Sequence, residues 1–384
     1  MSVKKKILYI HHDEGKSGAS RSLSFILDKI NPEKYDARVN CIFNGPVLEL
    51  YKDKPVQLVI GRGIFPFHGS TVSGMYLELF LRNIIRIPQT LYYASKLIRN
   101  QKPDLIHLNS SALFIVAMVA KLVNKNIKTV CHVREPLLKY SLSAKIIKYM
   151  CYLFVDHFIA IDRHTGSTMK TKKNLSIIYN SVNFEDYNHK LQSTTLRDEF
   201  NLSGDAVIFL YLARITRVNG ALELVRVANA VNKTHLNFHF VLAGFPKNNM
   251  SKYANKIAKE SADNPNIHLT KFRKDVPSII ASSDVTVVPF TVPHFARAIV
   301  ESSAIGKPSI GANIGGVNEL IIDQKTGLLY DNEQEFYNCC IKLGTDKVLR
   351  NKMGNAALEF AKGNFDNNIS SSRIFNVYDN LLNQ

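Results

Sequence analysis

The strongest constraint on the fold is a regular alternation of short apolar segments with segments of helical character. Strands separated by helices form parallel sheets with right-handed crossovers. The pattern runs through the first half and restarts in the second, which predicts an α/β chain of two doubly wound, Rossmann-like domains. The expected strands are Lys6–His11, Asp104–Leu108, Lys128–Val133, His157–Ala160 and Ser176–Tyr179, then Ala206–Ala213, Asn237–Ala243, Ile267–Leu269, Val285–Pro289 and Ser309–Gly311.

The boundary between the two series falls in the polar stretch Asn180–Asn188. We therefore expect an N-terminal domain over residues 1–182, a C-terminal domain over residues 183–365 and a final helical segment over residues 366–384. The last helix is predicted at about residues 368–382, because apolar side chains recur there at helical spacing.

Charge is distributed unevenly between the two halves. The net charge is +17; residues 1–180 contain 27 Lys and Arg against 12 Asp and Glu, whereas residues 181–384 contain 22 against 20. A basic half is typical of a protein that meets an anionic surface, such as membrane headgroups, nucleic acid or a phosphorylated ligand. A basic surface that simply faces water is the alternative.

Several features predict a cytoplasmic protein. The best apolar run, Ala112–Val123, is too short for a membrane span and contains Lys121. No secretory signal is expected, because the apolar run after the basic start stops at Ile10. The five scattered cysteines show no zinc-binding spacing and are typical of a reducing compartment.

One segment of the first half, Tyr76–Arg99, is both apolar and basic. It carries four basic residues against the single acid Glu78, and it is interrupted at Pro88. A helix pair of this kind can lie on an anionic membrane surface, where each basic residue adds about 1 kcal/mol. An amphipathic helix packed on the sheet with its basic face in water gives the same pattern, and periodicity does not separate the two.

Three loops between a strand and a helix carry residues that suit an anion. Gly18 lies where the loop "HHDEGKSGAS" enters a helix, whose N-terminus presents unpaired N–H groups. Arg214 and Arg217 follow a strand of the second half, and two guanidinium groups suit a diphosphate. Gly315 and Gly316 permit close approach of backbone to ligand. Taken singly, each loop is also typical of ordinary turns and solvated arginines.

Motifs of the second half agree in order and spacing with those of one family. "ARITRVNG" resembles the family's GRLxxxKG, "FVLAGFP" resembles VIVGDGP, and "FARAIVESSAIGKPSIGANIGGVNELIIDQKTGLLY" resembles its longest motif. The match runs from about Ala206 to Tyr330. The chain thus resembles the retaining family 4 glycosyltransferases, whose GT-B fold has two facing Rossmann-like domains and a C-terminal helix that returns to the first. Weaker counterparts, such as "PDLIHLNSS" and "TVCHVREP", occur in the first half.

The resemblance implies a nucleotide-sugar site in the second domain. Glu301 aligns with the second Glu of the family's E-x7-E motif, which binds the ribose; the first Glu falls at Pro293, with His294 beside it as a substitute. The implied donor-binding residues are Gly18, Asn219, Phe272, Arg273, His294, Phe295, Ala296, Arg297, Glu301, Gly315 and Gly316.

The diphosphate contact is the second departure from the family pattern. Arg214 aligns with the family's diphosphate-binding Arg, but the partner Lys is replaced by Asn219, and Arg217 in the same loop is the expected substitute. One lost donor at such a site costs on the order of 10²–10³ in rate. With no DxD motif in the chain, the resemblance implies metal-independent transfer of a hexose with retention, without a cofactor. The donor is expected to be a UDP-sugar, with a GDP-sugar as the alternative.

In the first domain the resemblance implies an acceptor site. His132 matches a family His near the anomeric centre, although a packed histidine at a strand end fits equally; together with Arg214 and Arg217 it makes up the expected catalytic set. Arg134 and Glu135 are expected to reach the acceptor. A glycan or lipid-linked diphosphate acceptor, at the inner face of the cytoplasmic membrane, would suit the basic half and surface-polysaccharide assembly.

Three other functions are compatible with parts of the sequence. A catalytically weak GT-B protein that binds nucleotide sugar or glycan for a partner would explain Pro293 and Asn219. A nucleotide-sugar epimerase would consume donor without an acceptor. Nucleic-acid binding is suggested by the net charge alone; the chain has no Trp and no recognisable binding motif, so no nucleic-acid partner is expected.

Overall fold

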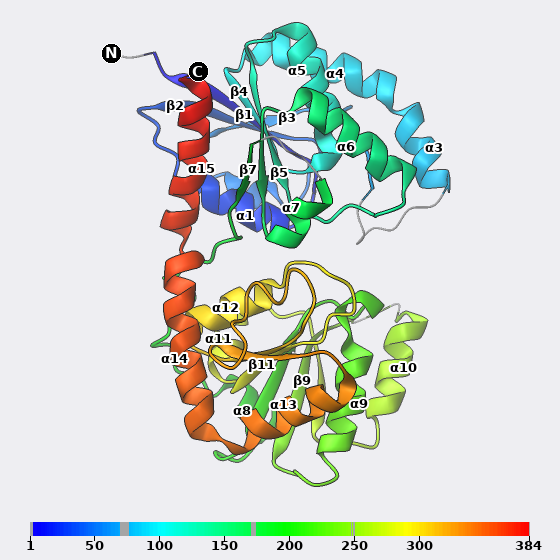
Figure 1. The fold of residues 1–384 in the computed structure, drawn as a ribbon, viewed down its shortest axis with the longest axis vertical. Coiled ribbons are helices and arrows are strands. Elements are labelled where there is room, and N and C mark those ends of the chain that lie inside the picture. The colour runs from blue at the N-terminus through cyan, green and yellow to red at the C-terminus, as the bar shows by residue number, and fades with distance from the viewer. Residues whose placement is uncertain (1–2, 70–76, 170–173, 247, 249, 384) are drawn as a thin grey trace. The chain divides into compact units, whose positions relative to one another are not determined.

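The computed structural model describes residues 3–69, 77–169, 174–246, 248 and 250–383, and it divides into two compact units (Figure 1). Unit 1 is Met1–Ser181 with Asn367–Gln384, and unit 2 is Val182–Asp366. Each unit is built on one parallel sheet covered by helices on both faces. The predicted α/β architecture of two Rossmann-like domains is confirmed.

The sheet of unit 1 has the strand order β3-β2-β1-β4-β5-β6-β7, with parallel pairing throughout the described part. The strands are β1 (Lys5–His11), β2 (Tyr35–Cys41), β3 (Gln57–Ile60), β4 (Leu105–Leu108), β5 (Lys128–Val133), β6 (His157–Ala160) and β7 (Leu175–Ile177). β2 and β3 were not predicted. β2 has polar residues at every second position, Asp36, Arg38 and Asn40, and β3 is an edge strand with mostly exposed side chains, so neither is a continuous apolar run.

Two layers of helices cover this sheet. On one face, α5 (Phe114–Val123) lies between α4 (Ile87–Gln101) and α6 (Leu142–Phe154), and all three contribute to one apolar core. On the other face lie α1 (Gly18–Asp28), the short α2 (Leu48–Tyr51) and α15 (Asn367–Leu382). The short helices η1 (Ser111–Leu113) and α7 (Arg163–Met169) complete the unit with α3 (Leu77–Ile85).

The last helix packs on unit 1, as the resemblance implied. Tyr378 is buried, and its hydroxyl lies 2.6 Å from Nδ1 of His107. Asp379 accepts hydrogen bonds from Lys34 and Tyr35. The C-terminal segment is therefore part of the first domain's core, and His107 is a packed core histidine.

The predicted break at Pro88 occurs close to that residue. α3 ends at Ile85 and α4 begins at Ile87, with Pro88 in its first turn, where a missing N–H leaves no hydrogen bond unmade. Tyr76, the first residue of the predicted segment, lies outside the described residues. No helix in the described part of the chain is long and apolar enough to span a bilayer.

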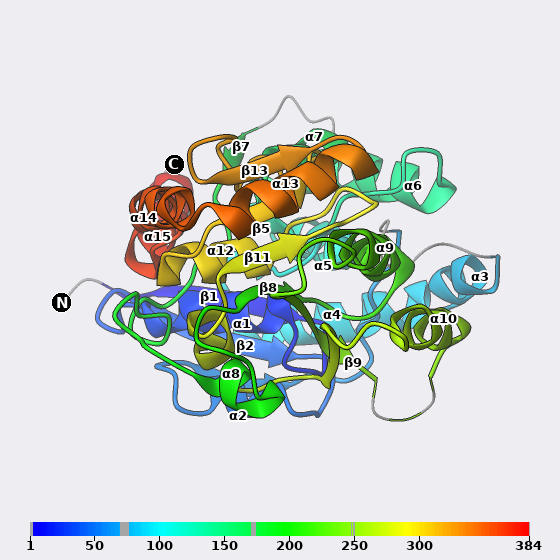
Figure 2. The same cartoon turned by 90° about the horizontal axis from the view of Figure 1, so that it is seen from below.

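The sheet of unit 2 has the order β10-β9-β8-β11-β12-β13. α9 lies between α10 and α13 on one face, and α8, α11, α12 and α14 follow one another on the other (Figure 2). The bounds are β8 (Val207–Leu212), η2 (Arg217–Asn219), α9 (Ala221–Val231), β9 (Phe238–Phe245), α10 (Lys252–Ser261), β10 (Ile267–Lys271), β11 (Val285–Val288), β12 (Ser309–Ala312) and β13 (Gly327–Tyr330), with α8 (Thr195–Phe200), α11 (Val276–Ala281), α12 (Arg297–Ile305), α13 (Glu333–Thr345) and α14 (Lys347–Asn364).

Candidate active site

Three loops of unit 2 meet at the carboxyl edge of its sheet. Gly220, between β8 and α9, has φ +68°, and a Cβ there would overlap the carbonyl of Pro289, which follows β11. Gly316, after β12, has φ +81°, and a Cβ there would overlap the backbone of His294. Only glycine fits both the positive φ and the close contact. These two glycines therefore hold together the loops that carry most of the predicted donor-binding residues.

Arg214 lies in the first of these loops with its backbone fixed and its side chain exposed. Its carbonyl accepts hydrogen bonds from Nδ2 of Asn219 at 2.7 Å and from the hydroxyl of Tyr211 at 3.1 Å. Within the described part of the chain, its guanidinium forms no ion pair. The guanidinium of Arg217 lies 6.0 Å from the ring centre of Tyr253. Of the two predicted diphosphate ligands, Arg217 thus has an aromatic neighbour, and Arg214 has an exposed side chain.

Asn219, one departure from the family pattern, is in contact with His294, the expected substitute beside the other departure, Pro293. Nε2 of His294 lies 3.1 Å from Oδ1 of Asn219, and Nδ1 lies 2.7 Å from the carbonyl oxygen of Val292. Burial lowers the pKa of His294, as does the charge of Arg214, against the opposing bond to Val292. A neutral ring can donate to only one of the two oxygens. An anionic ligand nearby would favour the doubly protonated ring, which satisfies both.

Glu301 is a buried carboxylate in α12, with 7% of its surface exposed. Its Oε1 accepts two hydrogen bonds of 3.3 Å from Nε and Nη2 of Arg297, one turn earlier. Oε2 accepts no hydrogen bond from any described residue. Phe295 and Ala296 lead into this helix, with Ala296 at the N-cap. The carboxylate is thus oriented by Arg297 and retains an oxygen that can accept from a ligand hydroxyl.

The loop after β10 holds the remaining predicted donor residues. Arg273 donates to both carboxylate oxygens of Asp275, at 2.9 and 2.8 Å, and to Glu199, and these bonds raise its pKa. Its guanidinium is engaged in this way, which leaves backbone groups for a ligand. Phe272 beside it is 70% exposed. An exposed aromatic ring here offers a face on which a nucleobase could stack.

In unit 1, His132 and Arg134 belong to a buried network at the end of β5. Arg134 donates from Nε to Asn109 at 2.7 Å, from Nη1 to Asn180 at 3.1 Å and from Nη2 to Nδ1 of His132 at 3.3 Å. Because a guanidinium only donates, Nδ1 of His132 accepts and its proton resides on Nε2. Burial, then the charge of Arg134, lower the pKa of His132 well below its usual value. Its Nε2–H is a buried donor without a described protein partner.

The same network reaches the glycine loop through residues that the sequence analysis did not single out. Asn109 donates to Nδ1 of His11 at 2.9 Å, Nε2 of His11 lies 3.1 Å from the hydroxyl of Ser20, and that hydroxyl donates to the carbonyl of Gly15 at 2.7 Å. Gly18 is the first residue of α1. The sequence did contain a signal for this cluster: Asn109 and Arg134 are polar residues that directly follow the central strands β4 and β5. The carboxyl ends of such strands converge at one edge of the sheet.

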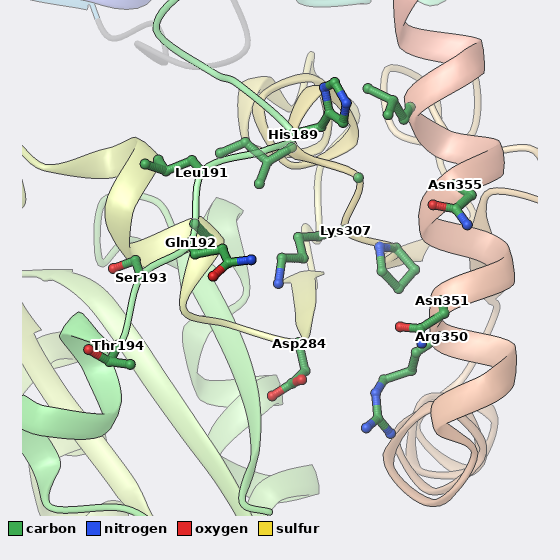
Figure 3. Close-up of a pocket in the computed structure, with 15 residues that line it drawn as sticks. His189, Leu191, Gln192, Ser193, Thr194, Asp284, Lys307, Arg350, Asn351 and Asn355 are labelled. Atoms are coloured by element: carbon green, nitrogen blue, oxygen red, sulfur yellow. The ribbon is translucent and has the colours of Figure 1, made fainter. Parts of the chain in front are cut away.

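A cavity of about 480 Å³ lies elsewhere in unit 2, where β11 and β12 begin (Figure 3). Its two cations have structural roles: Nζ of Lys307 donates to the carbonyl of Ser283 at 2.6 Å, just after α11, and Arg350 donates to that of Leu343 at 2.7 Å, in the last turn of α13. Cations at helix C-termini satisfy unpaired carbonyls. None of the predicted donor residues lines this cavity.

Comparison with known proteins agrees with the geometry of both units. The family model "Glycosyltransferase Family 4" matches residues 61–186, and "Glycosyl transferases group 1" matches residues 192–360. An Escherichia coli protein described as UDP-Gal:alpha-D-GlcNAc-diphosphoundecaprenol alpha-1,3-galactosyltransferase is 23% identical over 357 residues, covering 87% of this chain and 86% of its own. A Salmonella typhimurium lipopolysaccharide 1,2-N-acetylglucosaminetransferase is 27% identical over 161 residues, 40% of this chain and 42% of its own.

The fold is shared with solved structures along the whole chain. The structure of Anabaena Alr3699/HepE in complex with UDP and glucose superposes with a TM-score of 0.78 at 19% identity, covering 98% of this chain and 100% of that one. At this identity the likeness shows the fold, while the two family models each match the sequence of much of one unit. The chain is a glycosyltransferase of the family 4 kind, with the GT-B fold.

Proposed function

We propose that the protein transfers a hexose from a nucleotide diphosphate sugar to a glycan or lipid-linked diphosphate acceptor, with retention at the anomeric carbon. The observation that carries the proposal is the loop cluster of unit 2, in which Arg214, the Asn219–His294 pair and the oriented carboxylate of Glu301 lie at one sheet edge. A cation and a buried carboxylate are the groups that a diphosphate and a ribose require.

The relatives support the choice of donor and acceptor. The Anabaena protein was solved with UDP and glucose, and the name of the Escherichia coli relative pairs UDP-Gal with a diphosphoundecaprenol acceptor. By this analogy the donor is a UDP-sugar, and a GDP-sugar is the alternative. No metal ion or cofactor is part of the proposal, because protein cations can neutralise the departing diphosphate.

The proposed step breaks the bond between the anomeric carbon and the diphosphate oxygen, and it forms the bond to the acceptor oxygen on the same face of the sugar. Glu301 holds the ribose, and Arg214 stabilises the charge that develops on the leaving diphosphate. The acceptor proton passes to that diphosphate. The buried Nε2–H of His132 is proposed to contact a hydroxyl of the transferred sugar, and Gly18 the donor phosphate.

The test is transfer from UDP- and GDP-sugars to α-GlcNAc diphosphate carried on a polyprenyl chain. We expect nucleotide release that depends on the acceptor, and an α-linked product from an α-linked donor, identified from the NMR coupling of the anomeric proton. A β-linked product would contradict retention. Donor consumption without acceptor would point to an epimerase, and nucleotide binding without transfer to any acceptor would favour the partner-subunit function.

We further propose that unit 1 lies on the inner face of the cytoplasmic membrane. α3 buries Leu79 and Asn83 and half-buries Phe80 against the core, but it exposes its four other large apolar residues, which a helix packed with only a basic face in water would not do. The segment 136–155, which contains α6, carries three lysines and no acid. The apolar side chains exposed on these two elements are Leu77, Leu81, Ile84 and Ile85 in one and Tyr140, Leu142, Tyr149, Tyr152 and Leu153 in the other.

The double substitution Lys145→Gln/Lys148→Gln is expected to weaken binding to anionic vesicles about 30-fold. Each basic residue near such a surface contributes about 1 kcal/mol to binding, so losing two costs about 2 kcal/mol. Co-sedimentation with phosphatidylglycerol vesicles at physiological salt measures the effect. Leu236→Glu is the control, because Leu236 is 76% exposed but lies in unit 2. Wild-type protein that stays in the supernatant would contradict the membrane proposal.

A further inference from the structure

A second cavity, of about 420 Å³, lies in unit 1 at the carboxyl edge of its sheet. Its lining comes from the loop after β1, from Phe43 just beyond β2, and from α3 with the turn before α4. Ligands of α/β folds bind at such an edge. The lining residues are His12, Asp13, Glu14, Phe43, Pro66, His68, Arg82 and Arg86.

The α3 side of the cavity is cationic. Arg82 is exposed, and the guanidinium of Arg86 lies 4.3 Å from the ring centre of Phe65. Neither arginine forms an ion pair with any residue that the structure describes. Both lie close enough to His68 for their charges to lower its pKa, after burial as the main cause. Asn83 fixes α3 against this wall by donating to the carbonyl of His68 at 3.1 Å.

The loop after β1 contributes groups to the lining that can bind hydroxyls. Asp13 is held by a hydrogen bond of 3.0 Å from the backbone N–H of Gly15, and Glu14 is exposed beside it. Nδ1 of His12 is buried and has no described hydrogen-bond partner. Burial lowers the pKa of His12 to about 4, so its ring is neutral near pH 7. Carboxylates and a neutral imidazole accept and donate hydrogen bonds to sugar hydroxyls.

This two-sided lining restricts the ligand class. A free phosphate would leave the carboxylates facing an anion, and a neutral sugar would leave two arginines without a counter-charge. A glycosyl diphosphate satisfies both sides, because it joins a hydroxyl-rich end to an anionic end. The predicted acceptor residues lie close by: the charge of Glu135 acts on His68, and that of Arg134 acts on His12.

We propose that this cavity binds the acceptor as a glycosyl diphosphate, with its sugar against Asp13, Glu14 and His12 and its diphosphate against Arg82 and Arg86. This inference rests on the proposed function, whose acceptor it places and orients. A lipid attached to the diphosphate would leave along α3, where Leu81 and Ile85 are 50% and 76% exposed. The two arginines that line the cavity thus belong to α3 and the turn after it, which also carry these exposed apolar residues.

The test uses α-GlcNAc diphosphate with a short alkyl chain, without vesicles, so that a lipid surface plays no part. For Arg82→Gln/Arg86→Gln we expect the acceptor KM to rise about 100-fold, with the affinity for UDP-sugar and the melting temperature unchanged. Alkyl α-GlcNAc, which lacks phosphate, should be used equally by wild type and variant. Arg99→Gln is the matched control, since Arg99 lies on α4 but does not line the cavity.

The outcomes separate this inference from the proposed function. Normal use of the diphosphate acceptor by the double variant, with an active wild type, would overturn the cavity assignment and leave the function intact. Calorimetric binding of the same acceptor, lost in the double variant and weakened about tenfold in Asp13→Asn, would support the assignment even if no transfer occurs. Wild-type protein that does not bind α-GlcNAc diphosphate overturns it.

Discussion

Replacing Arg214 by alanine is expected to lower kcat for sugar transfer by about 10²–10³-fold, the usual effect of removing one donor aimed at developing charge. The departing diphosphate gains charge in the transition state, so the loss falls on kcat more than on the donor KM. The fold should survive, because Tyr211 and Asn219 bind the backbone carbonyl of Arg214, which the substitution leaves in place. Steady-state kinetics measures the loss in kcat, and the melting temperature shows whether the fold is intact.

Arg217→Ala is the matched control for this experiment. It removes the same charge from the same loop, but the guanidinium lies beside Tyr253. We expect less than about a tenfold loss in kcat, since a cation that does not face the diphosphate gives only a diffuse electrostatic contribution. Equal losses in the two variants would show that Arg217 swings into the site and supplies the charge that the family's lysine provides. No loss in Arg214→Ala would remove Arg214 from the catalytic set.

The fold followed closely from the sequence wherever strands are buried on both faces. β5 and β6 have the predicted bounds, because central strands of a parallel sheet are continuous apolar runs. β3 could not be predicted in this way, since it is an edge strand whose exposed residues carry no such signal. The position of β3 in the sheet depends on its pairing with β2, a contact between residues far apart in the chain, which a local sequence pattern does not reveal.

The candidate site was predicted only one residue at a time. The motifs selected Asn219 as one departure from the family and His294 as the substitute beside the other, Pro293. Asn219 and His294 are 75 positions apart, and the structure joins them by one contact of 3.1 Å. The pair exists because Gly220 and Gly316 allow two loops to approach without side chains between them. An amide at Asn219 thus stands where the family has a lysine, and the imidazole of His294 lies beside Pro293, where the family has a glutamate. The departure at Asn219 is therefore in direct contact with the substitute beside Pro293, which makes this pair the place to test donor specificity.

Glu301→Ala is expected to weaken binding of the UDP-sugar by about 10- to 100-fold, because hydrogen bonds to a charged group contribute roughly 1.5–3 kcal/mol. Arg297 orients the carboxylate through Oε1, so the other oxygen is positioned before the ligand arrives. Thermal stabilisation by UDP-, GDP-, ADP- and dTDP-sugars should identify one nucleotide that stabilises the wild type and has a much smaller effect on the variant.

The ribose contact itself is tested by a 2′-deoxy-UDP-sugar, which removes one of the two hydroxyls. Wild type should bind it more weakly than the parent donor, while Glu301→Ala should bind the two alike, because the partner of the missing hydroxyl is already gone. Glu260→Ala is the control, since Glu260 also pairs with a basic residue one turn away, Lys256, but lies on α10. If Glu301→Ala still binds the parent UDP-sugar more tightly than the 2′-deoxy analogue, the role of Glu301 is to stabilise α12 through its hydrogen bonds with Arg297. The ribose is then bound by other groups of the loop cluster.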